Sequence, residues 1–391
     1  MTKLPEPTGL TESTEATEPT VPSATLDLLY SETEEELRSA VRSLLVDRCD
    51  PAGILARAET GRPHDPALWG TLAAGIGTAG LLVPEKLGGQ GASHREAAVV
   101  LEELGRAVAP VPYLTSAVLA TEILLGCDPG TDEVGALLRE LAAGRQICVP
   151  AVPLTLAPGA PLPAAVRDSG GGVLTGAVTS VADAVAADVL LVLADTGLYA
   201  VPAASAAVAA LVPLDLTRPL ATVTLDAAAG TRLADPATAR AAIAGALLCG
   251  AGLLASEQLG LAEWCLTETV GHVRGRHQFN RPVGSFQAVK HRLAQLWLDV
   301  ASARAAARAA ADALATGAAD APLTVAVAQA YCSGVAVRAA EECVQLHGGI
   351  GMTWEHPAHL YLKRAKADSL ALGTAGHHRA LVADFAELPT P

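Results

Sequence analysis

Two stretches decide the fold of this chain: R-G-R-H-Q-F-N-R-P-V-G-S-F-Q-A-V-K-H-R-L (residues 274–293) and Q-L-H-G-G-I-G-M-T-W-E-H-P-A-H-L-Y-L-K-R-A (residues 345–365). The first stretch gathers cations in an otherwise acidic sequence, namely Arg274, Arg276, Arg281, Lys290 and Arg292. Arginine can hold phosphate with its bidentate fork. Cations at a helix C-terminus are also typical of a solvated helix end, and spacing alone favours that simpler interpretation.

The second stretch combines a glycine cluster with several histidines. Three glycines within residues 348–351 let the backbone approach a ligand closely, and the helix expected from Pro357 presents an N-terminus that favours anions. Taken alone, the cluster also fits an ordinary turn between helices. His347, His356 and His359 suggest a metal, but no Asp, Glu or Cys repeats at the spacing of a zinc protease. We therefore predict surface or capping histidines and no metal site.

Outward from these stretches, the pattern runs helices, strands, helices. Ser31 with Glu34 and Ser93 with Glu96 are capping boxes in an N-terminal region that looks all-helical. Short apolar runs separated by Gly, Pro and Asp follow, and they predict strands at 147–152, 173–178, 189–193, 198–201 and 222–225.

Helix is predicted to restart at Asp235-Pro236, with Asp as N-cap and Pro at the first position. Because strands and helices do not alternate, a doubly wound α/β fold is excluded. The fold class is mainly α with a central β domain. The predicted divisions are a disordered tail, an N-terminal helical domain, a middle β domain and a C-terminal helical bundle, at 1–26, 27–144, 145–233 and 234–391.

Composition narrows the possible partners and location. The chain has 391 residues and a formal net charge of -14, so nucleic acid and anionic membranes are not expected partners. Its seven cysteines are dispersed without C-x-x-C spacing, which indicates reduced thiols and no disulfide framework. No apolar segment marks a signal peptide. The apolar run at 240–257 is shorter than the ~20 residues of a membrane span, so a buried helix, no membrane insertion and a cytoplasmic location are expected.

Together the two stretches resemble the acyl-CoA dehydrogenase family. Residues 276–287 match R-x-Q-F-G-R-P-I-G-x-F-Q, and residues 345–357 match Q-x-x-G-G-x-G-x-x-x-E-x-P. Residues 80–91 (G-L-L-V-P-E-K-L-G-G-Q-G) and 101–105 resemble the N-terminal domain of the family. The resemblance spans nearly all of 27–387. It implies a helical domain, a β-barrel-like domain and a four-helix bundle, assembled as a dimer of dimers.

The resemblance also implies a binding site for FAD between subunits. Arg276 would hold the FAD pyrophosphate of the adjacent subunit, with Gln278, Phe279 and Gln287 lining the same site. The adenosine-diphosphate part would be approached by Gln345, Leu346, His347, Gly348 and Gly349. The last FAD-contacting turn would be followed by Gly376, His377 and His378, where the family more often has Gln at the last of these positions.

The catalytic carboxylate of the family is missing. Most members carry a Glu before a Gly-Thr in the bundle, and here Leu372 occupies that place; a minority carry it on the first bundle helix, at the position of Gly250. Neither residue can abstract a proton, so no catalytic residue is predicted. Glu257 and Asp368 are weak substitutes, and a structural role is the favoured interpretation of both.

The β domain departs from the family as well. The T-E-P-x-A-G-S-D motif is absent from the corresponding residues 149–159, and residues 180–182 lack the aromatic and hydroxyl groups that pack against the flavin. Two functions remain open. The first is FAD-dependent α,β-dehydrogenation of an acyl-CoA or acyl-carrier thioester, alone or in a heteromeric enzyme whose partner chain supplies the base, with electron-transfer flavoprotein as acceptor. The second is a catalytically silent scaffold or regulatory subunit. The preserved Arg276 favours the first, and the lost motifs favour the second.

Overall fold

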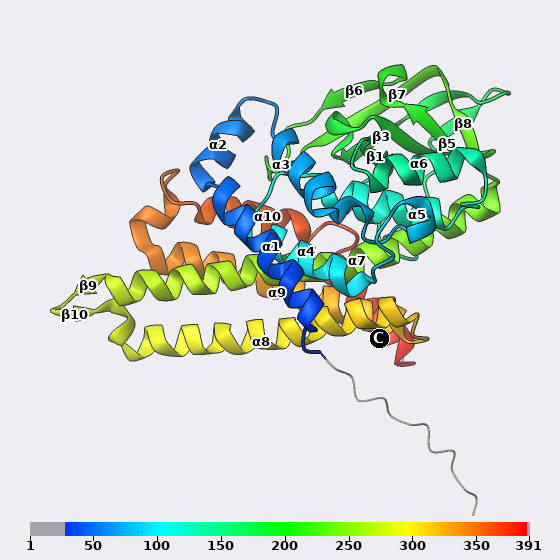
Figure 1. Ribbon diagram of the computed structural model, residues 1–391. Helices are drawn as coiled ribbons and strands as arrows, with labels where there is room; N and C mark the ends of the chain where they lie inside the picture. Colours follow the sequence, from blue (N-terminus) through cyan, green and yellow to red (C-terminus); the bar gives the residue numbers. More distant parts are fainter. Residues whose placement is uncertain (1–27, 389–391) are drawn as a thin grey trace, which may run out of the picture.

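The computed structural model describes residues 28–388, and its N-terminal region is helical (Figure 1). Both predicted capping boxes form, at Ser31 and Ser93, so the predicted starts of helices α1 and α4 are confirmed. The α-helices of this region are α1 (Glu32–Arg48), α2 (Pro51–Glu59), α3 (Pro66–Gly70), α4 (His94–Ala107), α5 (Thr121–Leu125) and α6 (Asp132–Ala142). Short π and 3-10 segments connect them, including η4 (Tyr113–Ala120).

The middle region contains two four-stranded sheets. Their strand orders are β1-β4-β5-β8 and β2-β3-β7-β6. The strands are β1 (Cys148–Pro150), β2 (Val166–Asp168), β3 (Val173–Ala182), β4 (Val189–Ala194), β5 (Gly197–Pro202), β6 (Ala207–Ala210), β7 (Leu220–Ala229) and β8 (Thr231–Ala234).

Each of the five predicted apolar runs lies on a strand, namely β1, β3, β4, β5 and β7. Strands β2, β6 and β8 were not predicted. Strand β1 is equally short but is fully buried, whereas most residues of these three strands are not buried, so pairing with longer neighbours specifies them.

The C-terminal region is a bundle of long helices. It comprises α7 (Pro236–Gly275), α8 (Gln287–Thr316), α9 (Ala321–His347), α10 (Ala358–Asp368) and α11 (Ala375–Phe385). As predicted, Asp235 caps α7. Gly317 ends α8 in the left-handed conformation. Glycine allows α7 to cross α4 closely, because a Cβ on Gly260 would lie 1.9 Å from the Glu102 carbonyl oxygen. The predicted fold class, mainly α with a central β region, is confirmed.

The apolar run at 240–257 belongs to a helix that is much longer than the run itself. It lies inside the 40 residues of α7. By length and composition, α7 and the helical stretch Ala321–Met352 could each cross a membrane. The most apolar windows of these helices are 61% and 56% buried inside the protein, and the core helix of a soluble protein passes the same test.

The ends of the molecule differ in character. At one end of α7 the sheets pack over the helix, and at the other end a two-stranded hairpin, β9 (His277–Gln278) and β10 (Arg281–Pro282), projects beyond the bundle (Figure 1). The helix-to-strand transition falls between Ala142 and Cys148, and the return to helix follows Ala234. The predicted tail at 1–26 lies outside the described residues.

Candidate functional site

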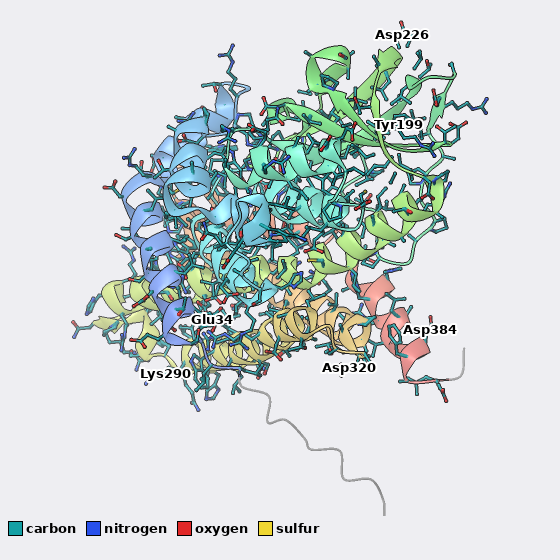
Figure 2. All side chains as sticks on the ribbon, turned by 45° about the vertical axis from the view of Figure 1, so that its right-hand side comes forward. Glu34, Tyr199, Asp226, Lys290, Asp320 and Asp384 are labelled. Carbon is teal, nitrogen blue, oxygen red and sulfur yellow. The ribbon has the colours of Figure 1, made fainter. Side chains whose placement is uncertain are left out.

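The cationic motif forms an exposed hairpin, which we call the basic hairpin (residues 276–287). Its strands pair antiparallel, and the turn residues Phe279 and Asn280 both have left-handed φ angles, 52° and 60°. That conformation is strained for a bulky residue such as Phe279, and strain of this kind is typical of functional sites. The Phe279 side chain is 85% exposed. Figure 2 shows Lys290, just beyond the hairpin on α8, far from Asp226 of the sheets.

The predicted phosphate-binding residues of this hairpin all face solvent. Arg276, Gln278 and Gln287 are exposed. The guanidinium of Arg281 lies 3.8 Å from the centroid of the Phe286 ring, which holds it on the hairpin. The arrangement can offer a charged fork and an exposed aromatic face to a ligand brought by another molecule.

The glycine loop follows α9 and lies beside the base of the hairpin. The link is a ring contact, with the centroids of His272 on α7 and His347 on α9 separated by 4.2 Å. Gln345, Gly348 and Gly349 are exposed. Within the described chain, a Cβ added at either glycine would meet no atom within 4 Å, so both leave open space for a ligand.

Two predicted cofactor contacts have buried side chains. His347 is 5% exposed and His378 is 1% exposed, so neither side chain faces solvent in this chain. The Nε2 of His378 lies 3.0 Å from the Leu372 carbonyl oxygen, an internal contact. Leu346 and His377 are half-buried, and Gly376 is exposed on the first turn of α11.

The two alternative base positions meet at one place. Gly250 on α7 and Leu372 after α10 are 122 residues apart in sequence (372 minus 250), yet a Cβ added to Gly250 would lie 3.2 Å from Leu372 Cδ1. The same atom would lie 2.4 Å from Leu119 Cδ2. The two positions therefore converge, but the place is filled with aliphatic side chains.

Around Leu372 the protein is nearly closed, and we call this place the closed pocket. Its cavity has a volume of about 10 Å³. That is room for about one water molecule. The lining residues come from η4, from β1 and the loop after it, from β3 and from the segment after α10, and are Thr115, Leu119, Pro150, Val152, Pro153, Leu154, Ala182 and Leu372. Residues 150–154 belong to the stretch 149–159, from which the T-E-P-x-A-G-S-D motif of the family is absent.

Backbone contacts hold Leu372 in this position. Its N–H donates to the Leu154 carbonyl oxygen at 2.8 Å, and its φ angle is 53°. Gly373 follows with a φ of 103°, and a Cβ there would lie 2.9 Å from Ala157 Cβ. The Leu372 side chain is thus fixed inside the pocket by the strand domain.

Glu257 and Asp368, the weak substitute bases, lie in a buried ion cluster instead. Arg218 donates to both Glu257 carboxylate oxygens at 2.7 Å and to Asp368 Oδ1 at 2.6 Å. Arg364 donates to Glu257 Oε1 at 2.6 Å and also pairs with Asp215. Neither Glu257 nor Asp368 is among the described residues that line the closed pocket, so the structural interpretation fits the geometry.

The charges of this cluster balance. Burial raises the pKa of a carboxyl, but at Glu257 the guanidiniums of Arg218 and Arg364 outweigh burial and lower the pKa. At Asp368, burial and then the Glu257 carboxylate raise the pKa to about 8. The guanidiniums of Arg218 and Arg364 thus face the carboxylates of Glu257 and Asp215, and the raised pKa of Asp368 favours the protonated form of that third carboxyl.

The two arginines of this cluster, Arg218 and Arg364, were not predicted from the sequence. Arg218 lies in the loop before β7, and Arg364 lies on α10. Each is a single Arg without a motif in its surroundings, and only the packing of the sheets on the bundle brings them to Glu257. A buried Glu in an otherwise apolar stretch of helix was the one available signal, since buried charges are almost always paired.

Comparison with known proteins agrees with this geometry. Residues 31–144 match the model of the acyl-CoA dehydrogenase N-terminal domain, and residues 240–386 match that of the C-terminal domain. Over 341 residues the chain is 35% identical to acyl-CoA dehydrogenase IpdE2 of Mycobacterium tuberculosis, which covers 87% of this chain and 93% of that protein. The chain belongs to the acyl-CoA dehydrogenase family. This is a family of flavoprotein oxidoreductases of lipid metabolism.

Solved structures of acyl-CoA dehydrogenases include heteromeric relatives. A chain of the ChsE4-ChsE5 complex from Mycobacterium tuberculosis is 30% identical, with a TM-score of 0.81 over 93% of this chain and 100% of that one. A variant of the Tcur3481-Tcur3483 steroid ACAD is 29% identical, with a TM-score of 0.79 over 91% of this chain and 98% of that one.

Proposed function

We propose that this acyl-CoA dehydrogenase chain is the base-lacking subunit of a heteromeric, FAD-dependent enzyme that dehydrogenates an acyl thioester between its α and β carbons. The partner chain supplies the catalytic carboxylate and the acyl pocket. This chain supplies the basic hairpin and the glycine loop as a surface for the partner's cofactor.

The closed pocket is the observation that carries this proposal. Dehydrogenation needs a carboxylate facing the α-carbon and space for the acyl group between that carboxylate and the flavin. Here Leu372 and Gly250 meet at the expected place, and the cavity beside them has a volume of about 10 Å³. A site that lacks both the base and the space supports a role for this chain outside the proton-abstraction step.

The basic hairpin and the glycine loop support a role in cofactor binding. FAD, when bound, would accept the hydride. The residues present fit its phosphates, because Arg276 is exposed on the hairpin and Gly348 and Gly349 are open to solvent. Arg276 would hold the pyrophosphate as a charged fork, and Gln278 and Gln287 would donate hydrogen bonds beside it. These side chains are exposed and do not line the closed pocket, which suits a cofactor shared with a neighbouring subunit.

Assembly with a partner is supported by exposed apolar surface and by the relatives. Large hydrophobic side chains are exposed on α8, α9 and the glycine loop, namely Trp297, Leu298, Val327, Tyr331, Ile350 and Met352. Surface of this kind is typical of protein interfaces. Two relatives were solved as complexes of two different chains, and one of them is a steroid ACAD. We therefore include steroid-derived acyl-CoAs among the substrates to test and electron-transfer flavoprotein among the acceptors.

The test is dye-coupled dehydrogenation over a panel of fatty and steroid acyl-CoAs. The chain is assayed alone, with FAD, and after co-expression with candidate partner chains that carry Glu at either base position. We expect flavin absorbance and turnover in the mixture. The chain alone should be slower by about 10²–10⁴-fold, the usual contribution of a positioned general base. Full-rate turnover by the chain alone would overturn the proposal.

A catalytically silent scaffold is the second candidate, and the lost β-domain motifs favour it. The assay separates the two. A partner complex that turns over equally well when Arg276 of this chain is replaced by Ala, and whose FAD content is also unchanged, would assign this chain a scaffold role.

A further inference from the structure

A cluster of imidazoles and a carboxylate lies behind the glycine loop and is not used by the proposed function. Glu268 and His272 lie one turn apart near the end of α7, His347 ends α9, and His356 precedes α10. The His347 ring lies between the other two, with centroid distances of 4.2 Å to His272 and 4.1 Å to His356. One donor atom each of Glu268, His347 and His356 lies within 4.8 Å of the others.

His347 has one ring nitrogen engaged and the other unused. Its Nδ1 lies 2.6 Å from the Cys343 carbonyl oxygen, so it donates its proton there. Its Nε2 is buried and has no hydrogen-bond partner among residues 28–388. Metal-binding histidines usually donate the second ring N–H to a backbone carbonyl in this way. An unpaired buried nitrogen is costly, and a ligand that accepts its lone pair removes that cost.

We propose that Glu268, His347 and His356 form a binding site for one divalent transition-metal ion, with Zn²⁺ the best match to the donors. Two imidazoles and one carboxylate are a usual zinc set, which leaves a fourth position for water. Zinc bonds of about 2.0–2.2 Å require the donors to move closer than their present spacing, by rotation of the half-exposed Glu268 and of His356. The ion would tie the ends of α7 and α9 to the start of α10. The proposal is independent of the dehydrogenase function.

His356 limits the affinity of this site. Its Nδ1 accepts the Ala358 N–H at 3.2 Å, which leaves the ring proton on Nε2, the atom 3.9 Å from Glu268 Oε1. Coordination through His356 replaces that proton and gives up the helix-capping bond. Loss of His356 should therefore weaken the site less than loss of His347.

A second group offers a matched comparison. Donor atoms of His94, Glu122 and Cys249 also lie within 4.8 Å of one another. There His94 Nε2 already engages Glu122 Oε1 at 3.1 Å, so its ring is satisfied without an ion. The donor set of that group includes a thiol, whereas the donor set of the proposed site does not. Bound Co²⁺ distinguishes the two groups, because a thiolate ligand produces a charge-transfer band.

The experiment uses the full-length chain without an affinity tag, stripped with chelator and titrated with Zn²⁺ and with Co²⁺ by calorimetry and absorbance. We expect one ion per chain and Co²⁺ bands without a thiolate charge-transfer band. His347→Phe, which keeps the ring volume, and Glu268→Gln should each weaken binding by about tenfold or more. His359→Phe and Cys249→Ser are the controls and should bind like wild type.

Circular dichroism and melting temperature check that each variant is folded. Equal affinities of wild type and folded His347→Phe would overturn the proposal, as would a failure of the wild type to bind either metal. A thiolate band that disappears in Cys249→Ser would move the ion to the second group and would also overturn it.

Discussion

The basic hairpin and the closed pocket are opposite in every physical respect. The hairpin is exposed, cationic and locally strained at Phe279, whereas the pocket is buried, aliphatic and has a cavity of about 10 Å³. In an acyl-CoA dehydrogenase both are binding places, one for the phosphates of FAD and one for the acyl group. Under the proposed function, this chain keeps the part of the site that serves a neighbour and has closed the part that would serve itself.

The largest effect on stability from a single substitution is expected in the buried ion cluster. Glu257→Gln should lower the free energy of unfolding by about 3–5 kcal/mol, because it removes the buried carboxylate that Arg218 and Arg364 both contact. Chemical denaturation at pH 7 measures this. Glu341→Gln, at an exposed pair with Lys366, is the control and should change stability by less than about 1 kcal/mol. A loss of similar size in both variants would mean that the cluster contributes no more to stability than an exposed ion pair.

A carboxylate restored to the closed pocket should not restore activity. In Leu372→Glu the new side chain would be buried among apolar groups, where its pKa rises by several units. A folded pKa near 7–8 against about 4.3 in the unfolded chain costs about 3–4 kcal/mol at pH 7, at about 1.4 kcal/mol per unit.

The sign of this effect gives a pH test. The penalty is absent below about pH 4, where both states are protonated, and it grows as pH rises toward the folded pKa. Leu372→Met, which conserves volume, should cost less than about 1.5 kcal/mol at every pH. Unfolding curves from pH 4 to 8 compare the two. An undiminished stability of Leu372→Glu at pH 8 would show that the pocket opens readily.

At the basic hairpin, a substitution is expected to change FAD binding and not the stability of the fold. Arg276→Ala should weaken FAD binding in the assembled enzyme by about 1.5–3 kcal/mol, or roughly 10- to 150-fold, because a charge-assisted contact is lost. Its unfolding free energy should change by less than about 0.5 kcal/mol, since the side chain is exposed. Arg292→Ala removes a nearby cation that already pairs with Glu342 and is the matched control. Equal flavin content in both variants would contradict the assignment.

The smallest effect at acidic pH is expected at Asp368. Burial and Glu257 raise its pKa to about 8, so the folded state holds a proton that the unfolded chain releases above about pH 4. Its contribution is therefore fully present below pH 4 and is lost between about pH 4 and 8. Asp368→Asn, which keeps an acceptor for Arg218, should leave stability at pH 4 nearly unchanged and should flatten the decline toward pH 8. A steeper decline in the variant would mean that Asp368 is ionised in the folded state.

The sequence predicted the elements that have strong local signals. The capping boxes at Ser31 and Ser93 and the Asp235-Pro236 helix start depend on contacts within a few residues, so one segment is enough to specify them. The five predicted strands carry apolar runs that are visible within one segment. The family resemblance rests on equally local motifs, and the exposed positions of Arg276 and Gly348 agree with it.

Only the tertiary structure could decide whether the site is open. Gly250 and Leu372 mark lost carboxylates in the sequence, but the side chains of Leu119 and Leu154 that fill the same place come from η4 and from the loop after β1. The ion cluster likewise joins Glu257 to Arg218 and Arg364 across two regions. Glu268 approaches His347 although 79 residues separate them (347 minus 268). Cavity volume, charge balance and the pairing of donor atoms are properties of distances between segments, and local sequence patterns specify the segments without specifying those distances.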